Sequence, residues 1–213
     1  MDDQPGLRER KKDTTRRLLS AAALTLFEEH GFEHASCAAI AEAAEVSKKT
    51  LFNYFSLKAD LVLEVARRPH VDEPATVVRQ RPPGQTPHGA LRDHLLTGLA
   101  ERRPVTGLSD DPDVLRLNRL IDITPALAER VAQYQQESLR LLVEALVDEG
   151  TPDLVARLVA AQVHGAHQVL VAENTRRVMA GEPLEAIHAD AVVATEHAYH
   201  LLEHGLGDLL RRP

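Results

Sequence analysis

Residues 36–58 read SCAAIAEAAEVSKKTLFNYFSLK, and this stretch decides the fold of the first third of the chain. Ser36 and Ser47 each precede a short segment of helical character, and serine is a favoured N-cap because its hydroxyl accepts a hydrogen bond from an unpaired backbone N–H group. Residues 45–47 leave room only for a sharp corner between the two segments. The pattern predicts either a helix-turn-helix or a plain corner between two helices of a helical protein.

The second predicted helix, residues 47–54, has two unlike sides. Leu51 and Phe55 are four residues apart, so both are expected in the core. The outward side carries polar residues, namely Lys48, Lys49, Thr50 and Asn53. Lysine can donate to guanine O6 and N7, and asparagine can pair with adenine. In a helix-turn-helix, this side is the one that enters a DNA major groove.

An amphipathic helix is predicted before this corner, and it should end at Gly31. Its apolar positions follow helical spacing: Leu19, Ala22, Ala23, Leu26 and Phe27. Residues 1–7 are expected to form a disordered tip. Ser56 is expected to cap a fourth helix that runs to about Arg67.

Charge divides the chain at Arg68. Residues 1–68 hold 11 basic and 11 acidic residues, whereas residues 69–213 hold 14 and 21, and the net charge of the whole is −7. Six basic residues crowd the run from Arg8 to Arg17. A neutral domain with a basic edge, attached to an acidic body, fits a protein that touches DNA at one end, although a charge run is also the ordinary start of a solvated helix.

Several classes of protein are disfavoured by composition. The single cysteine, Cys37, excludes an internal disulfide framework and suits a reducing compartment, so we expect a cytoplasmic protein. No apolar run approaches the roughly 18 residues of a membrane span, and the first residues lack the apolar core of a signal peptide. No membrane partner and no cofactor are therefore expected.

Prolines organise the rest of the chain. Five of the twelve fall within residues 69–87, which we interpret as a connection with at most a short helical turn near residues 75–79. Further helices are expected at about 89–102 and from Pro112. Three more should have proline at their first position: Pro125, Pro152 and Pro183. No strand pattern is found, so the sequence predicts an all-α chain of about nine helices.

The N-terminal segment resembles a known family. The runs LLSAAALTLFEEHGF and IAEAAEVSKKTLFNYFSLKADL are similar to the N-terminal domain of TetR-family transcriptional regulators, with matching anchors over about residues 13–66. The resemblance implies three domains or segments. Residues 1–68 would form a helix-turn-helix DNA-binding domain built on three helices, residues 69–87 a proline-rich connection, and residues 88–213 a helical domain for ligand binding and dimerisation.

Together with the geometry above, the resemblance implies the DNA contacts. The groove-facing candidates are Lys48, Lys49, Thr50 and Asn53; the candidates for phosphate or minor-groove contacts are Arg16, Arg17, Ser36, Ser47, Tyr54 and Lys58. Four positions depart from the family pattern. Phe52 replaces a tyrosine and so lacks a phenolic hydroxyl, Cys37 and Ala38 stand where relatives often have threonine and a larger residue, and Glu45 stands at the corner where glycine is common.

The resemblance also implies a twofold dimer that binds a palindromic operator and dissociates from it when a small effector binds. The last two helices are the expected dimer surface, because residues 154–172 are apolar almost all round. Repression and activation both stay open. Two alternatives are a DNA-binding regulator without an effector and a histidine-based metalloenzyme; the second lacks any nucleophile–base signature, so no enzyme is expected.

The effector is expected to be apolar. Only two aromatic residues follow residue 68, Tyr134 and Tyr199, and a pocket lined by aliphatic side chains suits a flexible apolar chain. The segment LNRLIDITPALAERVAQYQ resembles members that bind acyl-CoA-like ligands, so a fatty-acid-like or acyl-CoA effector is the hypothesis. Candidate pocket residues are Leu117, Leu120, Ile121, Leu127, Tyr134, His164 and His167.

Histidines on the last two helices raise a metal alternative. His197, His200 and His204 share one helical face, and His164 and His167 lie one turn apart. No H-E-x-x-H or cysteine-rich spacing accompanies them, so the sequence favours no metal site. Polar residues at a helix–helix interface, with sensitivity near pH 6, explain the same pattern.

Overall fold

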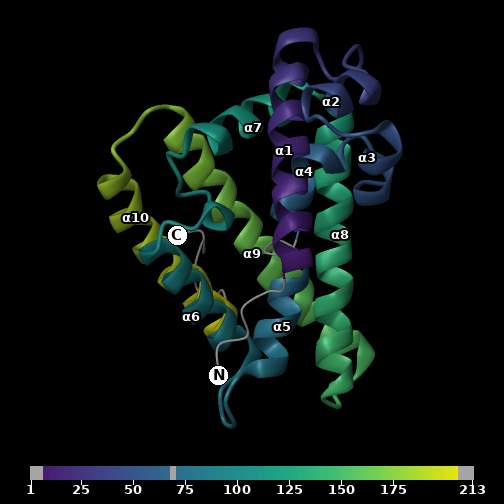
Figure 1. Cartoon of the computed structure of the whole chain (residues 1–213). Helices are drawn as coiled ribbons and strands as arrows, with labels where there is room; N and C mark the ends of the chain where they lie inside the picture. Colours follow the sequence, from purple (N-terminus) through teal and green to yellow (C-terminus); the bar gives the residue numbers. More distant parts are fainter. Residues whose placement is uncertain (1–6, 68–70, 206–213) are drawn as a thin grey trace. The chain divides into compact units, whose positions relative to one another are not determined.

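The computed structural model describes residues 7–67 and 71–205, and all regular structure within those ranges is helical (Figure 1). The predicted all-α fold is therefore confirmed, with ten α-helices in those ranges where the sequence predicted about nine. The predicted disordered tip lies outside the described residues except for Leu7, which begins the first helix. The chain divides into two compact units: residues 1–65 with 116–131, and residues 66–115 with 132–213.

The first unit is built on the helix-turn-helix. Its helices are α1 (Leu7–His30), α2 (Cys37–Ala43), α3 (Lys48–Tyr54) and most of α4 (Asp60–Arg67). The side of α1 predicted to be apolar is largely the one that packs, with Leu19, Ala23 and Phe27 fully buried. Phe27 and Phe32 meet edge to face, with ring centroids 5.0 Å apart, in the geometry that aromatic pairs prefer.

The corner between α2 and α3 has the predicted caps. The Ser36 hydroxyl accepts a hydrogen bond from the backbone N–H of Ala39 (3.1 Å), and the Ser47 hydroxyl accepts one from Thr50 (3.0 Å). Between the helices, Glu45 has φ of +54°, a left-handed conformation that side chains with a Cβ adopt at a cost. The corner is therefore well capped but strained at Glu45.

Gly31 ends α1 as predicted, because its φ of +80° and the hydrogen bond from its N–H to the Phe27 carbonyl (2.9 Å) form the expected left-handed cap. The prediction that Ser56 caps the next helix is wrong. Residues 56–59 form a turn in which the Asp60 N–H donates to the Leu57 carbonyl, and α4 begins only at Asp60.

A segment distant in sequence completes the first unit. Residues 116–131 comprise most of α7 (Pro112–Ile123) and the first turns of α8 (Pro125–Asp148). Arg116 binds the Glu28 carboxylate on α1, with Nε 2.9 Å from Oε2. Arg130 binds the buried Asp60 carboxylate on α4 through both Nε (2.7 Å) and Nη2 (3.2 Å). Two ion pairs thus join this segment to the helices around the corner.

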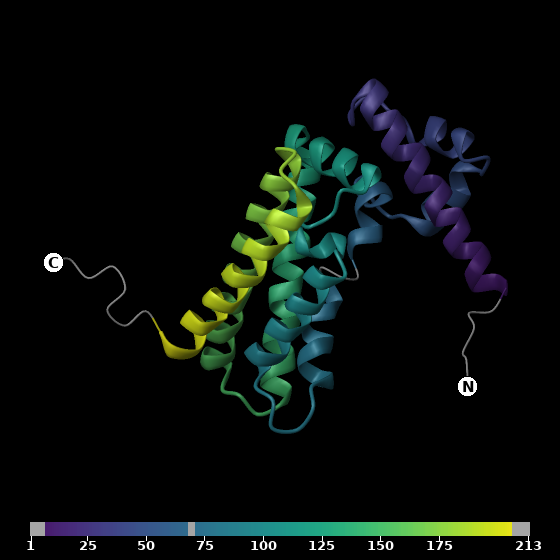
Figure 2. The ribbon, with the colours of Figure 1, turned by 90° about the vertical axis from the view of Figure 1, so that its left-hand side faces the viewer.

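The second unit contains the rest of α8, from residue 132 on, and the remaining helices: α5 (Glu73–Gln80), α6 (Pro87–Ala100), the 3₁₀ turn η2 (Pro104–Thr106), α9 (Asp153–Met179) and α10 (Leu184–His204). Within it, α10 packs along both α6 and α9, as the views in Figures 1 and 2 show. One part of its core lies around Leu95, Leu146 and Tyr199, and the other around Leu99, Leu108 and Ile187.

The proline-rich stretch contains more structure than the sequence predicted. Helix α5 fills residues 73–80 of the expected connection, and Ala75 and Val78 are buried in the core of the second unit. Pro125 opens α8 as predicted. Pro152 and Pro183 instead occupy the N-cap positions of α9 and α10, without a side-chain cap, so both helices begin one residue later than expected.

Replacing Glu45 by glycine should stabilise the protein, because glycine adopts a positive φ without steric cost. We expect a gain of about 1 kcal/mol in the free energy of unfolding, and a rise in Tm of roughly 2–4 °C. Arg102, the other non-glycine residue with a positive φ in the described residues (+52°), should respond in the same direction. In thermal denaturation, Glu42→Gly, within helix α2, serves as the control and should lower Tm. A decrease in Tm for Glu45→Gly would contradict strain at the corner.

Candidate nucleic-acid interface

The surface of α3 follows from its packing. Leu51 and the capping residue Phe55 are buried in the core of the first unit, with exposed fractions of 1% and 2%. The side of α3 opposite to Leu51 faces solvent. Lys48, Lys49 and Asn53 are accordingly exposed, as the sequence predicted. This side therefore presents two cations and an amide to the surroundings.

Phe52 is an exposed aromatic residue on the same short helix. Nearly half of its surface, 49%, is open to solvent, and the Lys48 ammonium group lies 5.9 Å from the centroid of its ring. A cation at that distance interacts favourably with the ring face. The residue that departs from the family pattern thus helps to hold Lys48 in place.

The hydroxyl groups predicted to contact phosphates are already hydrogen-bonded. Ser36 and Ser47 cap their helices, and the Ser47 and Thr50 hydroxyls also share a hydrogen bond of 2.8 Å. A serine hydroxyl that accepts a cap bond keeps its own proton as a donor. The cap hydrogen bonds therefore fix the orientation of the Ser36 and Ser47 hydroxyl groups. The contact of these hydroxyl groups with DNA phosphates stays a prediction.

The structure brings Arg16 and Tyr54 together. The guanidinium carbon of Arg16 on α1 lies 5.8 Å from the centroid of the Tyr54 ring on α3. The Arg16 Nη1 atom also lies 3.9 Å from Oδ1 of Asp13. The next residue, Arg17, is exposed. The middle of α1 and the end of α3 therefore form one continuous surface with cationic side chains.

Lys58 stands apart from the other candidates. Its ammonium group donates hydrogen bonds to the backbone carbonyls of Phe32 and Glu33, the second at 3.3 Å. It also lies 4.7 Å from the Phe32 ring centroid and 5.5 Å from that of Phe27. These contacts tie the loop after α1 to the loop before α4, a structural role that spacing alone does not reveal. A phosphate contact by Lys58 stays a prediction.

The residues predicted for the effector fall in both units. On α7 and the start of α8, Leu120 and Leu127 are buried, and Leu117 and Ile121 are half-buried. In the second unit, Tyr134 is buried on α8, and His164 and His167 are half-buried on α9.

His164 takes part in a short hydrogen-bonded chain. Burial lowers its pKa, which keeps the ring neutral at pH 7. The neutral ring can then accept from Gln168 (3.3 Å), which in turn accepts from Gln135 on α8 (2.7 Å).

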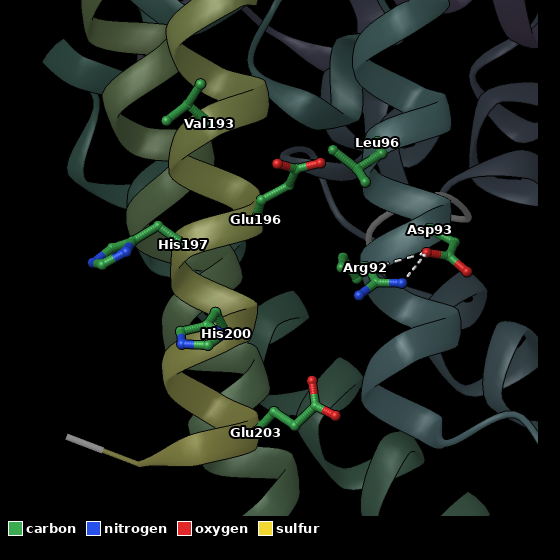
Figure 3. Close-up of a pocket in the computed structure, with 8 residues that line it drawn as sticks. All are labelled: Arg92, Asp93, Leu96, Val193, Glu196, His197, His200 and Glu203. Carbon is green, nitrogen blue, oxygen red and sulfur yellow. Dashed lines mark hydrogen bonds and ion pairs between the residues drawn. The ribbon is translucent and has the colours of Figure 1, made fainter. Parts of the chain in front are cut away.

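An open hollow of about 560 Å³ lies between α6 and α10 (Figure 3). It is lined by Arg92, Asp93 and Leu96 from α6 and by Val193, Glu196, His197, His200 and Glu203 from α10. In the close-up, the Glu196 and Glu203 carboxylates extend toward α6, whereas the His197 ring points away from it. None of the seven predicted effector residues lines this hollow.

Binding a metal ion needs grouped ligating side chains, and spanning a membrane needs a long apolar helix. Across residues 7–67 and 71–205, no three histidine, cysteine or acidic side chains are grouped closely enough to hold a metal ion. Within the same ranges, no helix combines the length and apolar character that crossing a membrane requires.

The capped corner and the exposed cationic side of α3 define a helix-turn-helix domain of the DNA-binding class. Residues 19–65 match the family described as "Bacterial regulatory proteins, tetR family". This match agrees with the resemblance that the sequence predicted, and the family that it describes is one of regulatory proteins.

One relative is HTH-type transcriptional regulator TcmR from Streptomyces glaucescens, which is 34% identical over 137 residues. The match covers 63% of this chain and 58% of that protein, so the chain spans less than two thirds of the relative's length.

Solved structures share the fold at lower identity. One is NalD, the secondary repressor of the MexAB-OprM multidrug efflux pump in Pseudomonas aeruginosa, at 21% identity and a TM-score of 0.52, with 92% of this chain and 97% of that chain covered. Another is a TetR-family regulator from Streptomyces coelicolor, at 18% identity and a TM-score of 0.50, with 94% and 99% covered.

The exposed side of α3 leads to a testable prediction about the recognition of DNA bases. Lys48→Ala and Asn53→Ala should each weaken binding to the specific site by about 1–3 kcal/mol, roughly 5- to 150-fold, with little effect on random DNA. Arg17→Ala should weaken binding to both DNAs by a similar factor, because a phosphate contact carries no sequence information. Fluorescence anisotropy on the two DNAs measures both effects. Equal losses on both DNAs for all three variants would exclude base reading by α3.

Proposed function

We propose that this protein is a ligand-responsive transcriptional regulator, acting as a repressor that binds a palindromic operator as a homodimer. A small apolar or acyl-type effector then releases it from the DNA. The observation that carries the proposal is the exposed side of α3, where Lys48, Lys49 and Asn53 stand on a capped helix within a TetR-family domain.

The chemistry of this surface matches a DNA major groove. Lysine donates to the acceptors at the guanine edge, and asparagine both donates to and accepts from the adenine edge. Lys49 and Asn53 are four residues apart, so they lie on adjacent turns of one face. Arg16 supplies further positive charge beside the Tyr54 ring of α3, and the next residue on α1, Arg17, is exposed. Base contacts and phosphate contacts are thus available on one continuous surface.

Helix α9 supports the homodimer, because it is apolar on two opposite sides. Ala156, Ala160 and Val163 are buried within the second unit. The opposite side is exposed, and it carries a stripe of residues at helical spacing: Leu154, Leu158, Gly165 and Val169. Exposed fractions of 55% for Leu158 and 69% for Val169 are unusual for aliphatic side chains that lie in one row. A second copy of α9 covers such a stripe under twofold symmetry.

The proposed effector rests on the aliphatic character of the candidate residues. Leu117, Leu120, Ile121 and Leu127 offer no aromatic stacking surface, which suits a flexible acyl chain. Among the candidates in the second unit, Tyr134, His164 and His167 carry polar groups of the kind that orient a ligand. The neutral His164 ring, held by Gln168, is a hydrogen-bonding group of this kind.

An effector can release the protein from DNA only if it binds one state of the protein more tightly than the other. An effector can shift the protein toward a state that does not fit the operator only by the extent to which it prefers that state. To move the population from mostly bound to mostly released, this preference must be about 5.5 kcal/mol. An effector that binds both states equally leaves the protein on its operator.

A mobility-shift experiment tests the proposal. The purified protein is incubated with the DNA that flanks its own gene, with and without a panel of fatty acids and acyl-CoAs. We expect a specific complex that one or more of these compounds dissolves, and the same compounds should raise Tm in a thermal-shift assay. A specific complex that no compound alters would favour a regulator without an effector. The absence of any specific complex would contradict the proposed function.

The dimer generates a separate prediction. Leu158→Arg places a charge on the exposed stripe of α9, so it should leave the fold intact but prevent a second copy from packing there. Light scattering should then give a mass near the chain mass of 23.5 kDa, not twice that value, and operator affinity should fall steeply. Val147→Arg, at an exposed aliphatic residue of α8 outside the stripe, is the matched control and should remain dimeric. A dimeric Leu158→Arg variant would place the interface elsewhere.

A further inference from the structure

Two histidines stand one turn apart at the C-terminal end of α10. His200 and His204 are four residues apart, so both lie on the same face of the helix. Their rings stack, with centroids 4.2 Å apart and planes inclined at 29°. Both residues are exposed to solvent. The last turns of α10 therefore present two imidazole rings side by side to the surroundings.

The helix that carries this pair is held by packing on its other side. Thr195 and Tyr199 are buried, and Tyr199 belongs to the core of the second unit. Helix α10 continues to His204 and ends where the Gly205 N–H donates to the Leu201 carbonyl (2.8 Å). The spacing of the two imidazole rings is therefore set by a packed helix and not by a loop.

A hydrogen bond determines which nitrogen of His204 carries the ring proton. Nδ1 of His204 lies 3.0 Å from the backbone carbonyl oxygen of His200. A carbonyl oxygen only accepts, so Nδ1 is the donor, and in the neutral ring the lone pair is on Nε2. A hydrogen bond from the second ring nitrogen is also what orients histidines that bind metals. The neutral ring of His204 thus has the tautomer of a metal ligand.

The separation of the rings suits a single metal ion. Bonds from imidazole nitrogen to a transition metal are about 2.0–2.1 Å long, so two nitrogens bound to one ion at a right angle lie about 3 Å apart. Exposed rings that already stack 4.2 Å apart reach this arrangement by small side-chain rotations. Water fills the positions that two protein ligands leave open. The site therefore agrees with the finding that residues 7–67 and 71–205 group no three ligating side chains.

The surroundings of the pair favour a cation. Residues 196–204 hold two carboxylates, those of Glu196 and Glu203, and no lysine or arginine. Both carboxylates extend toward α6, where Arg92 pairs with Asp93 at 2.9 Å (Figure 3). The C-terminal end of a helix also carries partial negative charge. These charges attract a metal ion to the end of α10.

We propose that His200 and His204 together bind one divalent transition-metal ion of the class that prefers imidazole ligands. Cu²⁺, Ni²⁺ and Zn²⁺ belong to this class, whereas Mg²⁺ and Ca²⁺ take oxygen ligands. Affinity should rise from Co²⁺ through Ni²⁺ to Cu²⁺, the order that nitrogen sites follow. The inference goes beyond the proposed function and is independent of it, because it requires neither DNA nor an effector.

Titration calorimetry on the untagged full-length protein tests the inference, with NiCl₂ and CuCl₂ as the probes. The wild type should bind one ion per chain. His200→Ala and His204→Ala should each weaken this binding by about 10-fold or more, because a single remaining imidazole loses the advantage of two linked ligands. A protonated ring cannot bind a metal, so lowering the pH from about 7.5 to about 5.5 should also weaken binding. MgCl₂ should not compete with Ni²⁺.

A second pair of histidines provides the matched control. His30 and His34 are also exposed and four residues apart, but α1 ends at His30, and Gly31 turns the chain with a φ of +80°. These two rings do not share a helical face, so the His30→Ala/His34→Ala variant should bind Ni²⁺ as the wild type does. Without metal, Tm should be similar for every variant, since the residues replaced are exposed. With Ni²⁺, Tm should rise for the wild type and the control but not for His200→Ala.

Electron paramagnetic resonance with Cu²⁺ identifies the ligands directly. The spectrum of the wild type should show coupling to two imidazole nitrogens, and that of either single variant to no more than one. The inference is wrong if the wild type binds neither Ni²⁺ nor Cu²⁺, or if His200→Ala and His204→Ala keep the wild-type affinity and spectrum. A loss of binding in the His30→Ala/His34→Ala control would likewise place the site elsewhere. None of these outcomes alters the proposed function.

Discussion

Burial of Leu51 and Phe55 is the constraint on which the first unit depends. Both side chains are buried, so the rotation of α3 about its own axis is settled by packing. That rotation leaves Lys49 and Asn53 in solvent. The polar surface is thus a by-product of the core, and a substitution that rotates α3 alters every outward side chain at once.

Local chemistry explains why so much of this unit could be predicted from the sequence. The Ser36 and Ser47 caps, the Gly31 terminus and the apolar spacing of α1 all act within a few residues of chain. The unusual Glu45 at the corner was visible in the sequence as well, and the structure shows its consequence in a positive φ. The helix-turn-helix could therefore be predicted from short-range preferences, whereas the expectation that it binds DNA came mainly from the resemblance to the family.

Long-range contacts set the limits of that prediction. Nothing near Arg116 or Arg130 in the sequence indicates that they bind Glu28 and Asp60, which lie 88 and 70 residues away. Lys58 was similarly predicted for phosphate, and only the structure reveals the carbonyls that its ammonium group contacts. Proline spacing located the later helices, but it could not indicate that α5 packs into a core.

The discontinuity of the first unit has a consequence for how such a protein can be recombined. Cutting after α4 would remove residues 116–131 and leave the buried Asp60 carboxylate without its Arg130 partner, a change that costs several kcal/mol when a charge stays buried. A chimera that joins the first unit to the ligand-binding part of another protein would therefore need both of its segments, residues 1–65 and 116–131. The same ion pair restricts how independently α4 and the start of α8 can change in evolution, since a substitution at Asp60 has to be matched near Arg130.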